Sequence, residues 1–379
     1  MTAGSARRPL PRSPDELPTP ALLLDLDRLE ANLASMAGRA AALGVALRPH
    51  IKTHKCIEVA RRQRELGAAG LTVSTLEEAR AFAAAGFDDL TWAFPVILGR
   101  LGEVRRLAER VRLGVVVDSE AAAAALEREG PRFRVFLKVD CGYGRAGVDP
   151  ETPEATALAR RLAASPRLDF AGLLTHSGHA YHVRDRDGAR RVAEQERRAV
   201  VGFAEALRAD GIDVPEVSAG STPAMAAVER LDGVTEARPG NYALYDGSQV
   251  ALGTCTAADC ALTVLASVVS RRSGHAVIDA GALALSKDPG PLHLGDAWRS
   301  GMGAVFEDEG AYRAGRPSER LHLSGLSQEH ASVSAPLPVG ARVRVLPNHS
   351  CLAVPCFEAC WVVRGEEVVG RWKIHRERT

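Results

Sequence analysis

Short runs rich in aliphatic and β-branched residues alternate with longer alanine-, arginine- and glutamate-rich runs from about residue 46 to residue 245. The runs between the short segments predict helices, for instance at 56–68, 76–86, 101–111 and 119–130. Eight such alternations of strand and helix are typical of a parallel (β/α)8 barrel of the TIM type, with a doubly wound open sheet as the alternative. The eight predicted strands are ALRPHI, GLTVST, DLTWAF, LGVVVDS, RVFLKVD, DFAGLLTHS, EVSAGS and VTEARP.

The pattern changes after residue 250, where short β-rich segments are bounded by glycine, proline and aspartate. These segments predict a second, smaller antiparallel β domain. An early strand, ALLLDLD at 21–27, precedes the first barrel helix at about 28–43, and we expect this strand to pair with the C-terminal sheet. The predicted organisation is a flexible arm at 1–19, a barrel at 20–248 and a β domain at 249–379.

Composition narrows the choice of ligand. The chain has 379 residues, and 48 Lys and Arg against 47 Asp and Glu leave a net charge of +1. This balance gives no electrostatic reason to expect nucleic acid or an anionic membrane as partner, so a small molecule fits better. The apolar runs are far shorter than the ~20 residues that span a bilayer. The N-terminus is polar and proline-rich, so we expect a cytoplasmic protein. The seven cysteines include no CxxC pair, and we expect no disulfides.

The stretch RPHIKTHK, residues 48–55, concentrates cations at the first barrel strand. Strand periodicity places Arg48, His50 and Lys52 toward the barrel axis. Buried cations need an anionic or reactive partner, and Lys52 lies at the strand end where barrel enzymes place their chemistry. Lys55 falls at the start of the next helix, and we expect it to face solvent. The alternative is a basic loop without a catalytic role.

A lysine buried among other cations can form a Schiff base with an aldehyde, and pyridoxal 5'-phosphate (PLP) is the obvious candidate. PLP also needs backbone N–H groups near helix N-termini to hold its phosphate. Two segments, SAGSTPAM at 218–225 and RPGNY at 238–242, follow the last two predicted strands. Phosphate sites in this type of barrel usually lie there. The sequence therefore predicts a PLP site between these loops and Lys52.

The segment DCGYGRAGV at 140–148 contains the pattern GxGxxG directly after a predicted strand. A dinucleotide site would need a helix opening at the third glycine, whereas VDPETPE, a turn with two prolines, follows here. We therefore expect the glycines to let Arg145 reach the barrel mouth.

In THSGHAYH, residues 175–182, three histidines and Tyr181 follow the sixth predicted strand. A metal cluster is conceivable, but the spacing matches no standard ligand set. Separate roles for His176, His179, Tyr181 and His182 are the preferred interpretation.

In the C-terminal half, RVRVLPNHSCL places His349 and Cys351 two residues apart. On an extended segment both side chains would point the same way and could share a zinc ion. Two protein ligands would leave coordination positions open, as in a catalytic site. From the spacing alone, however, a buried filler cysteine and a turn histidine are the simpler interpretation.

These motifs together resemble the D-serine dehydratase/D-threonine aldolase family of fold-type III PLP enzymes. Members of this family pair an alanine-racemase-like barrel with a small β domain. The resemblance covers nearly the whole chain after about residue 17. Its segments are TPALLLDLDRLEANL, RPHIKTHK, DCGYGRAGV, GLLTHSGHAY, the GSTP turn, RPGNYALYD, DAGALALSKD, LSQEHA and PNHSC.

The resemblance implies roles for particular residues. Lys52 would be the Schiff-base lysine, Arg145 would contact the cofactor ring oxygen, and Tyr181 would lie beside the substrate. His349 and Cys351 would hold Zn²⁺, or another divalent ion such as Mn²⁺ or Co²⁺, which reverses the preference reached from spacing alone. The cofactor-binding set would comprise His50, Lys52, Arg145, His176, Gly220, Ser221, Thr222, Gly240 and Asn241.

The resemblance also implies a PLP- and metal-dependent lyase acting on small D-3-hydroxy amino acids, and a homodimer. The H-x-C and GSTP segments favour a dehydratase, acting on D-serine or D-threo-3-hydroxyaspartate and giving a keto acid and ammonia. D-threonine aldolase-type cleavage to glycine and an aldehyde is the alternative. An amino-acid racemase would need a second base but no metal pair. A non-catalytic PLP carrier would lack the β domain of about 130 residues.

Overall fold

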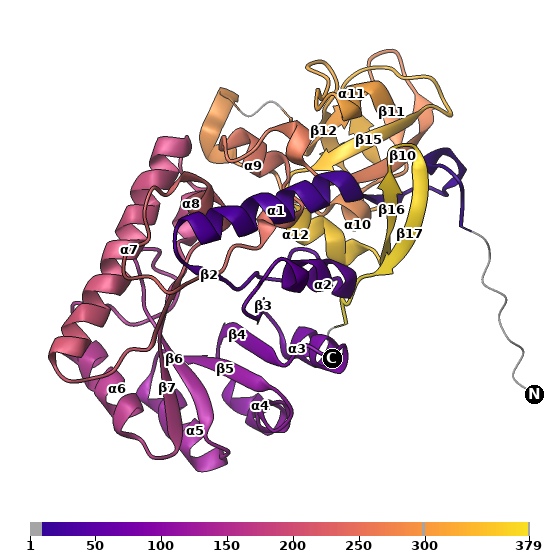
Figure 1. Ribbon diagram of the computed structural model, residues 1–379. Helices are drawn as coiled ribbons and strands as arrows, with labels where there is room; N and C mark the ends of the chain where they lie inside the picture. Colours follow the sequence, from indigo (N-terminus) through magenta and orange to yellow (C-terminus); the bar gives the residue numbers. More distant parts are fainter. Residues whose placement is uncertain (1–9, 298–299, 378–379) are drawn as a thin grey trace, which may run out of the picture.

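Eight short parallel strands form one curled sheet in the order β2-β9-β8-β7-β6-β5-β4-β3. The computed structural model describes residues 10–297 and 300–377, and its two sheets are seen in Figure 1. The sheet closes between β2 and β3, the two ends of this order. A bridge between His50 and Thr72 and a 2.9 Å hydrogen bond from Ala69 N to Leu47 O connect them. The strands are β2 (Ala46–Leu47), β3 (Leu71–Val73), β4 (Asp89–Pro95), β5 (Arg112–Val117), β6 (Phe133–Lys138), β7 (Leu168–Leu174), β8 (Glu216–Ala219) and β9 (Glu236–Ala237).

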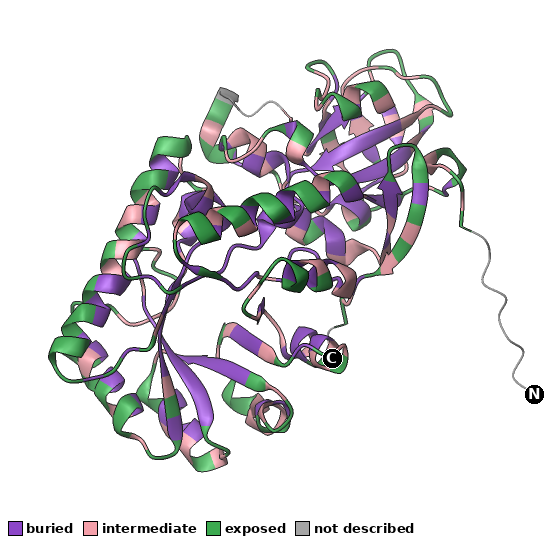
Figure 2. Ribbon diagram, viewed as in Figure 1, coloured by how far each residue is buried: buried purple, intermediate pink, exposed green. Residues whose placement is uncertain are grey.

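A helix follows each of β2 to β8, so the predicted alternation of strand and helix is confirmed. The longer of these helices turn an apolar stripe toward the sheet and a polar face toward solvent, as the colouring of Figure 2 shows. Hydroxyl side chains begin several of them; Ser119, for example, accepts a bond from the third residue of its helix. The helices are α2 (Ile57–Glu65), α3 (Leu76–Ala84), α4 (Leu101–Ala108), α5 (Glu120–Glu129), α6 (Pro153–Ala164), α7 (Arg186–Ala209) and α8 (Thr222–Ala227).

The first barrel strand is shorter than the pattern predicts, because β2 ends at Leu47 and the chain turns at residues 51–54. Arg48 nevertheless lies inside the barrel, where its guanidinium is 2.5 Å from both Asp89 and Glu236. The anionic partner that an inward cation requires is therefore present in the form of two carboxylates.

Lys55 is buried, and the expectation that it faces solvent is wrong. The turn at residues 51–54 gives Lys55 a φ of 48°, which directs its side chain inward. Its ammonium pairs with Glu78, whose side chain is only 1% exposed. The helix that Lys55 was expected to open begins two residues later, at Ile57. The expectation fails because Lys55 belongs to the turn before the helix and not to the helix itself.

The C-terminal half forms a mainly antiparallel sheet in the order β13-β14-β11-β10-β1-β16-β17, with β15 joining β10 and β12. Strand β1 (Ala21–Asp25) lies inside this sheet, antiparallel to β10 and parallel to β16. The other strands are β10 (Leu262–Arg271), β11 (Ala276–Ile278), β12 (Gly303–Phe306), β13 (Leu323–Leu326), β14 (Ala331–Val333), β15 (Arg342–Pro347), β16 (Ala359–Arg364) and β17 (Glu367–Lys373).

Helix α1 (Leu26–Ala42) leads from this second sheet back to the barrel and crosses the junction between them (Figure 1). One hydrophobic cluster contains Val115 and Val217 from barrel strands together with Val264 and Val345 from the β domain. The two parts thus share a core, which sets the position of any pocket between them. The short helices of this half are α9 (Gly247–Ala251), α10 (Ala282–Leu285), α11 (Glu309–Arg313) and α12 (Ser350–Ala353).

The predicted flexible arm at 1–19 is described from residue 10 onward, and residues 1–9 lie outside the described residues. Its last part is bound to the β domain. Val368 N donates to Arg12 O at 3.0 Å, and the Arg342 guanidinium donates to the carbonyl of Leu17 at 2.6 Å.

Among the described residues, no helix is both long enough and apolar enough to cross a bilayer.

Replacing Lys55 with methionine is expected to lower the free energy of unfolding by about 3–5 kcal/mol, because Glu78 would keep a buried charge without its cation. Methionine has a side chain of similar length, and adopting a positive φ costs it about the same free energy as it costs lysine. Urea denaturation followed by circular dichroism would measure the change. The matched control is Lys373→Met, because Lys373 pairs with Glu377 at the surface and should contribute less than ~1 kcal/mol. Equal destabilisation by both substitutions would contradict the assignment.

Candidate active site

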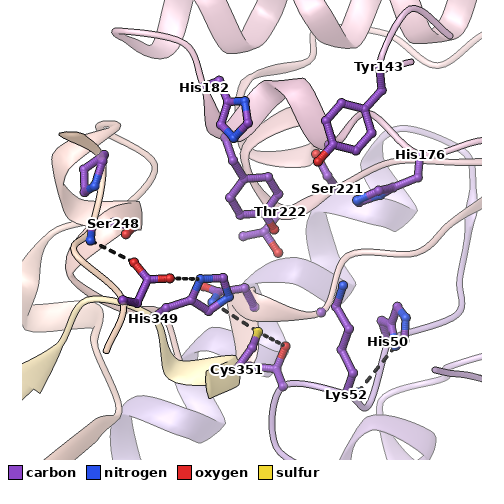
Figure 3. A pocket seen from close by; sticks show the side chains of 18 of the residues that line it. His50, Lys52, Tyr143, His176, His182, Ser221, Thr222, Ser248, His349 and Cys351 are labelled. Atoms are coloured by element: carbon purple, nitrogen blue, oxygen red, sulfur yellow. Dashed lines mark hydrogen bonds and ion pairs between the residues drawn. The ribbon is translucent and has the colours of Figure 1, made fainter. Parts of the chain in front are cut away.

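A pocket of about 650 Å³ opens at the carboxyl ends of the barrel strands, against the β domain. Its volume lies in the usual range for small-molecule sites, roughly 300–1,000 Å³. Both parts of the chain contribute to its wall (Figure 3). The predicted site residues among its lining are His50, Lys52, Arg145, His176, Tyr181, Ser221, Thr222, Gly240, Asn241, His349 and Cys351.

Lys52 lies between His50 and Cys351, with its side chain directed into the pocket (Figure 3). Its backbone N–H faces His50 Nδ1 at 3.4 Å. Burial, reinforced by the charge of Lys52, lowers the pKa of His50 well below its usual value, and it does the same to His176. Both imidazoles are therefore neutral near pH 7, so Lys52 has two uncharged neighbours that can accept or donate hydrogen bonds.

The two predicted phosphate loops form one wall of the pocket. The Ser221 side chain accepts the Ala224 N–H at 3.4 Å at the start of α8, and Thr222 Oγ1 accepts the Tyr242 N–H at 3.1 Å. A Cβ at Gly240 would lie 2.7 Å from the His50 carbonyl oxygen, so no side chain fits there. The loops are thus built for close approach of backbone and hydroxyl groups to a ligand.

Gly220 is the exception among the predicted residues, because it is not part of the pocket lining. Its N–H donates to Glu196 Oε1 at 3.1 Å and is not free to bind a phosphate. Its φ of 97° instead allows the tight turn between β8 and α8.

Sequence reasoning missed Glu196 of α7, which joins the loops after β7 and β8. Besides Gly220, its carboxylate accepts the Ser177 N–H at 2.8 Å and the Ser177 hydroxyl at 2.7 Å. Ser177 Oγ lies 3.1 Å from Ser221 Oγ, which links this network to the phosphate loop. Burial raises the pKa of Glu196. The sequence feature that could have identified Glu196 is its place in the buried face of α7, between Ala193 and Val200.

His349 and Cys351 come together in the pocket wall, although the predicted extended segment is wrong. Strand β15 ends at Pro347, and His349 is the residue before α12, so Cys351 lies in the first turn of a helix. The thiol is 3.1 Å from Thr53 Oγ1. Burial by itself would raise the pKa of Cys351, but the neighbouring His349, Lys52 and Thr53 together outweigh it and the pKa lies below its usual value.

The donor chemistry of this pair fits a transition-metal ion. An imidazole nitrogen and a thiolate are both ligands that zinc prefers. Within the described ranges, no group of three or more His, Cys, Asp or Glu side chains converges as a closed metal site. Asp288, which sequence reasoning also missed, faces His349 Nδ1 from 3.4 Å.

The mouth of the pocket is lined by aromatic and basic side chains. The Arg145 guanidinium lies 4.9 Å from the centre of the Tyr143 ring, and the rings of His182 and His293 are 6.0 Å apart. Burial raises the pKa of Tyr181, so its hydroxyl stays protonated at neutral pH. His176 and His182 reach the pocket. Three residues of this lining that the sequence did not single out are Tyr143, Arg238 and His293.

The loop with the GxGxxG pattern does not open a helix, since α6 begins only at Pro153. The N–H groups of Gly142 and Gly144 both donate to Asp140 Oδ1, at 3.0 and 3.1 Å. These donors are used within the loop itself, so the pattern is not a dinucleotide site, as the sequence indicated.

Comparison with known proteins identifies both parts of the chain. Residues 24–248 match the N-terminal domain of alanine racemase, and residues 261–363 match a serine dehydratase domain. The order and approximate extent of these two matches follow the barrel and the β domain described above.

Three characterised relatives cover most of the chain. D-threo-3-hydroxyaspartate dehydratase from Delftia sp. (strain HT23) is 39% identical over 94% of this chain and 97% of its own length. Its solved structure has a TM-score of 0.90 and 38% identity over 96% of this chain and 99% of that one. D-serine dehydratase from Dictyostelium discoideum is 32% identical, over 94% and 95% of the two chains. D-threonine aldolase from Arthrobacter sp. is 33% identical, over 94% and 92%. The chain therefore belongs to the D-serine dehydratase/D-threonine aldolase family, whose members join an alanine-racemase-like barrel to a serine dehydratase domain.

Proposed function

We propose that the chain is a PLP- and metal-dependent lyase that removes water from a D-3-hydroxy amino acid to give a 2-oxo acid and ammonia. The observation that carries this proposal is the meeting of Lys52 with His349 and Cys351 in one pocket. The barrel supplies an amine for the cofactor, and the β domain supplies donors for a metal ion. The dehydratases among the relatives support the reaction type.

The pocket residues fit both groups. Lys52 would hold PLP by its aldehyde, and the loops at 221–222 and 240–241 would hold its phosphate, with Arg145 at the ring. His349 and Cys351 would hold Zn²⁺ or a related divalent ion. When bound, PLP draws electrons away from the α-carbon, and the metal ion makes the β-hydroxyl a better leaving group.

Lys52 is the residue proposed to move the α-proton. Its amine lies in the pocket beside two neutral imidazoles, so neither adds a second positive charge next to it when it accepts a proton. Loss of the α-proton and the β-hydroxyl leaves an enamine, which water hydrolyses to the 2-oxo acid and ammonia. Tyr181 and Arg145, which also line the pocket, would orient the substrate and cofactor.

Retro-aldol cleavage to glycine and an aldehyde is the second candidate. The likeness to the Arthrobacter D-threonine aldolase favours it. It would need a base that removes the proton of the β-hydroxyl, and the neutral His176 is available in the pocket.

Two further expectations stay predictions. The family implies a homodimer, and the sequence predicts a cytoplasmic location.

The product panel distinguishes these reactions. Purified holoenzyme mixed with D-serine, D-threonine or D-threo-3-hydroxyaspartate is expected to release 2-oxo acid and ammonia in equal amounts, without glycine. Removal of metal by EDTA should lower the rate by on the order of 10²-fold, because a Lewis acid contributes several kcal/mol at a leaving group. Added Zn²⁺ should restore it. Glycine and aldehyde in place of ammonia would make the chain an aldolase.

Lys52→Ala is expected to lower kcat/KM by about 10²–10⁴-fold or more, because the proton-transfer group is lost together with the cofactor anchor. Initial rates of ammonia release would measure this. Borohydride reduction of the wild-type holoenzyme followed by peptide mass spectrometry should place the cofactor on Lys52. The control is Lys287→Ala, an exposed lysine near the pocket, which should keep wild-type rates. Labelling of Lys55 or another lysine would refute the assignment.

A further inference from the structure

We propose that Asp288 is a positioning residue that sets the orientation and tautomer of His349, and thereby the metal affinity of the pocket. This inference rests on the metal site proposed for His349 and Cys351. Asp288 belongs to the loop after α10, far from the His-x-Cys segment in the chain. Only the tertiary structure brings its carboxylate to the imidazole.

The two oxygens of Asp288 have different partners. Oδ2 lies 3.4 Å from His349 Nδ1, and Oδ1 accepts the backbone N–H of Gly290 at 2.8 Å. The bond to Gly290 restrains rotation of the carboxylate, so one oxygen keeps facing the imidazole. Asp288 is thus held as an acceptor for the Nδ1–H of His349.

The backbone of the Asp288 loop is held by the residue that precedes His349. The side-chain amide of Asn348 is buried and donates to the carbonyl oxygens of Asp288 and Gly301, each at 2.9 Å. Asn348 therefore couples the position of the carboxylate to that of the imidazole. The loop and the His-x-Cys segment form one preorganised unit.

The other nearby carboxylate, Asp246, is engaged elsewhere. Its Oδ2 accepts bonds from Asn241 Nδ2 at 2.6 Å and from Ser350 N at 2.9 Å, and its Oδ1 accepts the Gln249 N–H at 3.0 Å. Both oxygens of Asp246 are used in holding the backbone. The contact with the imidazole is made by Asp288.

A carboxylate that accepts the proton of one imidazole nitrogen fixes the tautomer, and the other nitrogen is left as the lone-pair donor for a metal. It also restrains the ring and makes the ligand nitrogen more basic. Here Nδ1 faces Asp288, so Nε2 is the nitrogen left for the ion. Without Asp288, the ring could rotate and either tautomer could form.

Metal titration of the PLP-loaded enzyme tests this role. The protein is first stripped of metal by EDTA, and Zn²⁺ is then titrated in competition with a chromophoric chelator. Asp288→Asn and Asp288→Ala are each expected to weaken Zn²⁺ binding by about 10–100-fold, the usual cost of losing such a partner. The Co²⁺-loaded variants should also show altered visible absorption, which reports on the ligand geometry directly.

The matched control is Asp308→Asn. Asp308 caps α11 away from the pocket, and asparagine is an equally good cap, so Zn²⁺ binding should stay at the wild-type value. Thermal unfolding of the metal-free proteins would show that the variants are folded. Zn²⁺ affinity within two-fold of wild type in both Asp288 variants would overturn the inference alone. If Cys351→Ser also left the affinity unchanged, the proposed metal site itself would fail.

Discussion

The buried carboxylate of Asp246 is the interaction on which the geometry of the pocket depends. Asp246 is 1% exposed, and it accepts bonds from Asn241 of the barrel and from Ser350 of the His-x-Cys segment. A buried charge needs its full set of donors, since losing one costs several kcal/mol, roughly the range measured for broken buried pairs. The loop that contains Asn241 and the His-x-Cys segment are therefore held in one relative position. Lys52 and Cys351 line the same cavity because of this connection.

Electrostatics explain why this pocket suits anionic ligands. Burial, together with the nearby Arg238 and Arg145, lowers the pKa of Lys138 to about 8, and burial lowers the pKa of Arg238 to about 10. These cations lie close to one another and repel one another. A phosphate and a substrate carboxylate would offset that repulsion on binding. His50 and His176 avoid adding to it because burial keeps them neutral.

Sequence patterns and the family resemblance predicted the barrel, the β domain and half of the residues that line the pocket, and they failed where local geometry changed. Strand periodicity predicted that Lys52 faces inward, and Lys52 does line the pocket, although the strand ends at Leu47 and a turn places it there. Lys55 was misplaced because it was assigned to the start of a helix, whereas a turn at positive φ directs it toward Glu78. His349 and Cys351 lie together in the pocket wall as expected, but the start of a helix and not an extended strand brings them there, and their metal role was implied by the family resemblance. Gly220 was assigned to the phosphate, whereas its N–H is bound by Glu196.

The sequence by itself determined the class of fold, because strand and helix periods are local properties of the chain, and it marked reactive side chains such as Lys52 as candidates. The roles of most pocket residues were implied by the family resemblance. The sequence did not determine the partners of those side chains. Glu196, Asp246 and Asp288 each act on residues far away in the chain, and no local pattern marks a carboxylate by what it will face. Their roles follow from burial, which requires every enclosed charge to find its donors. Only the packing of the barrel against the β domain decides which donors those are.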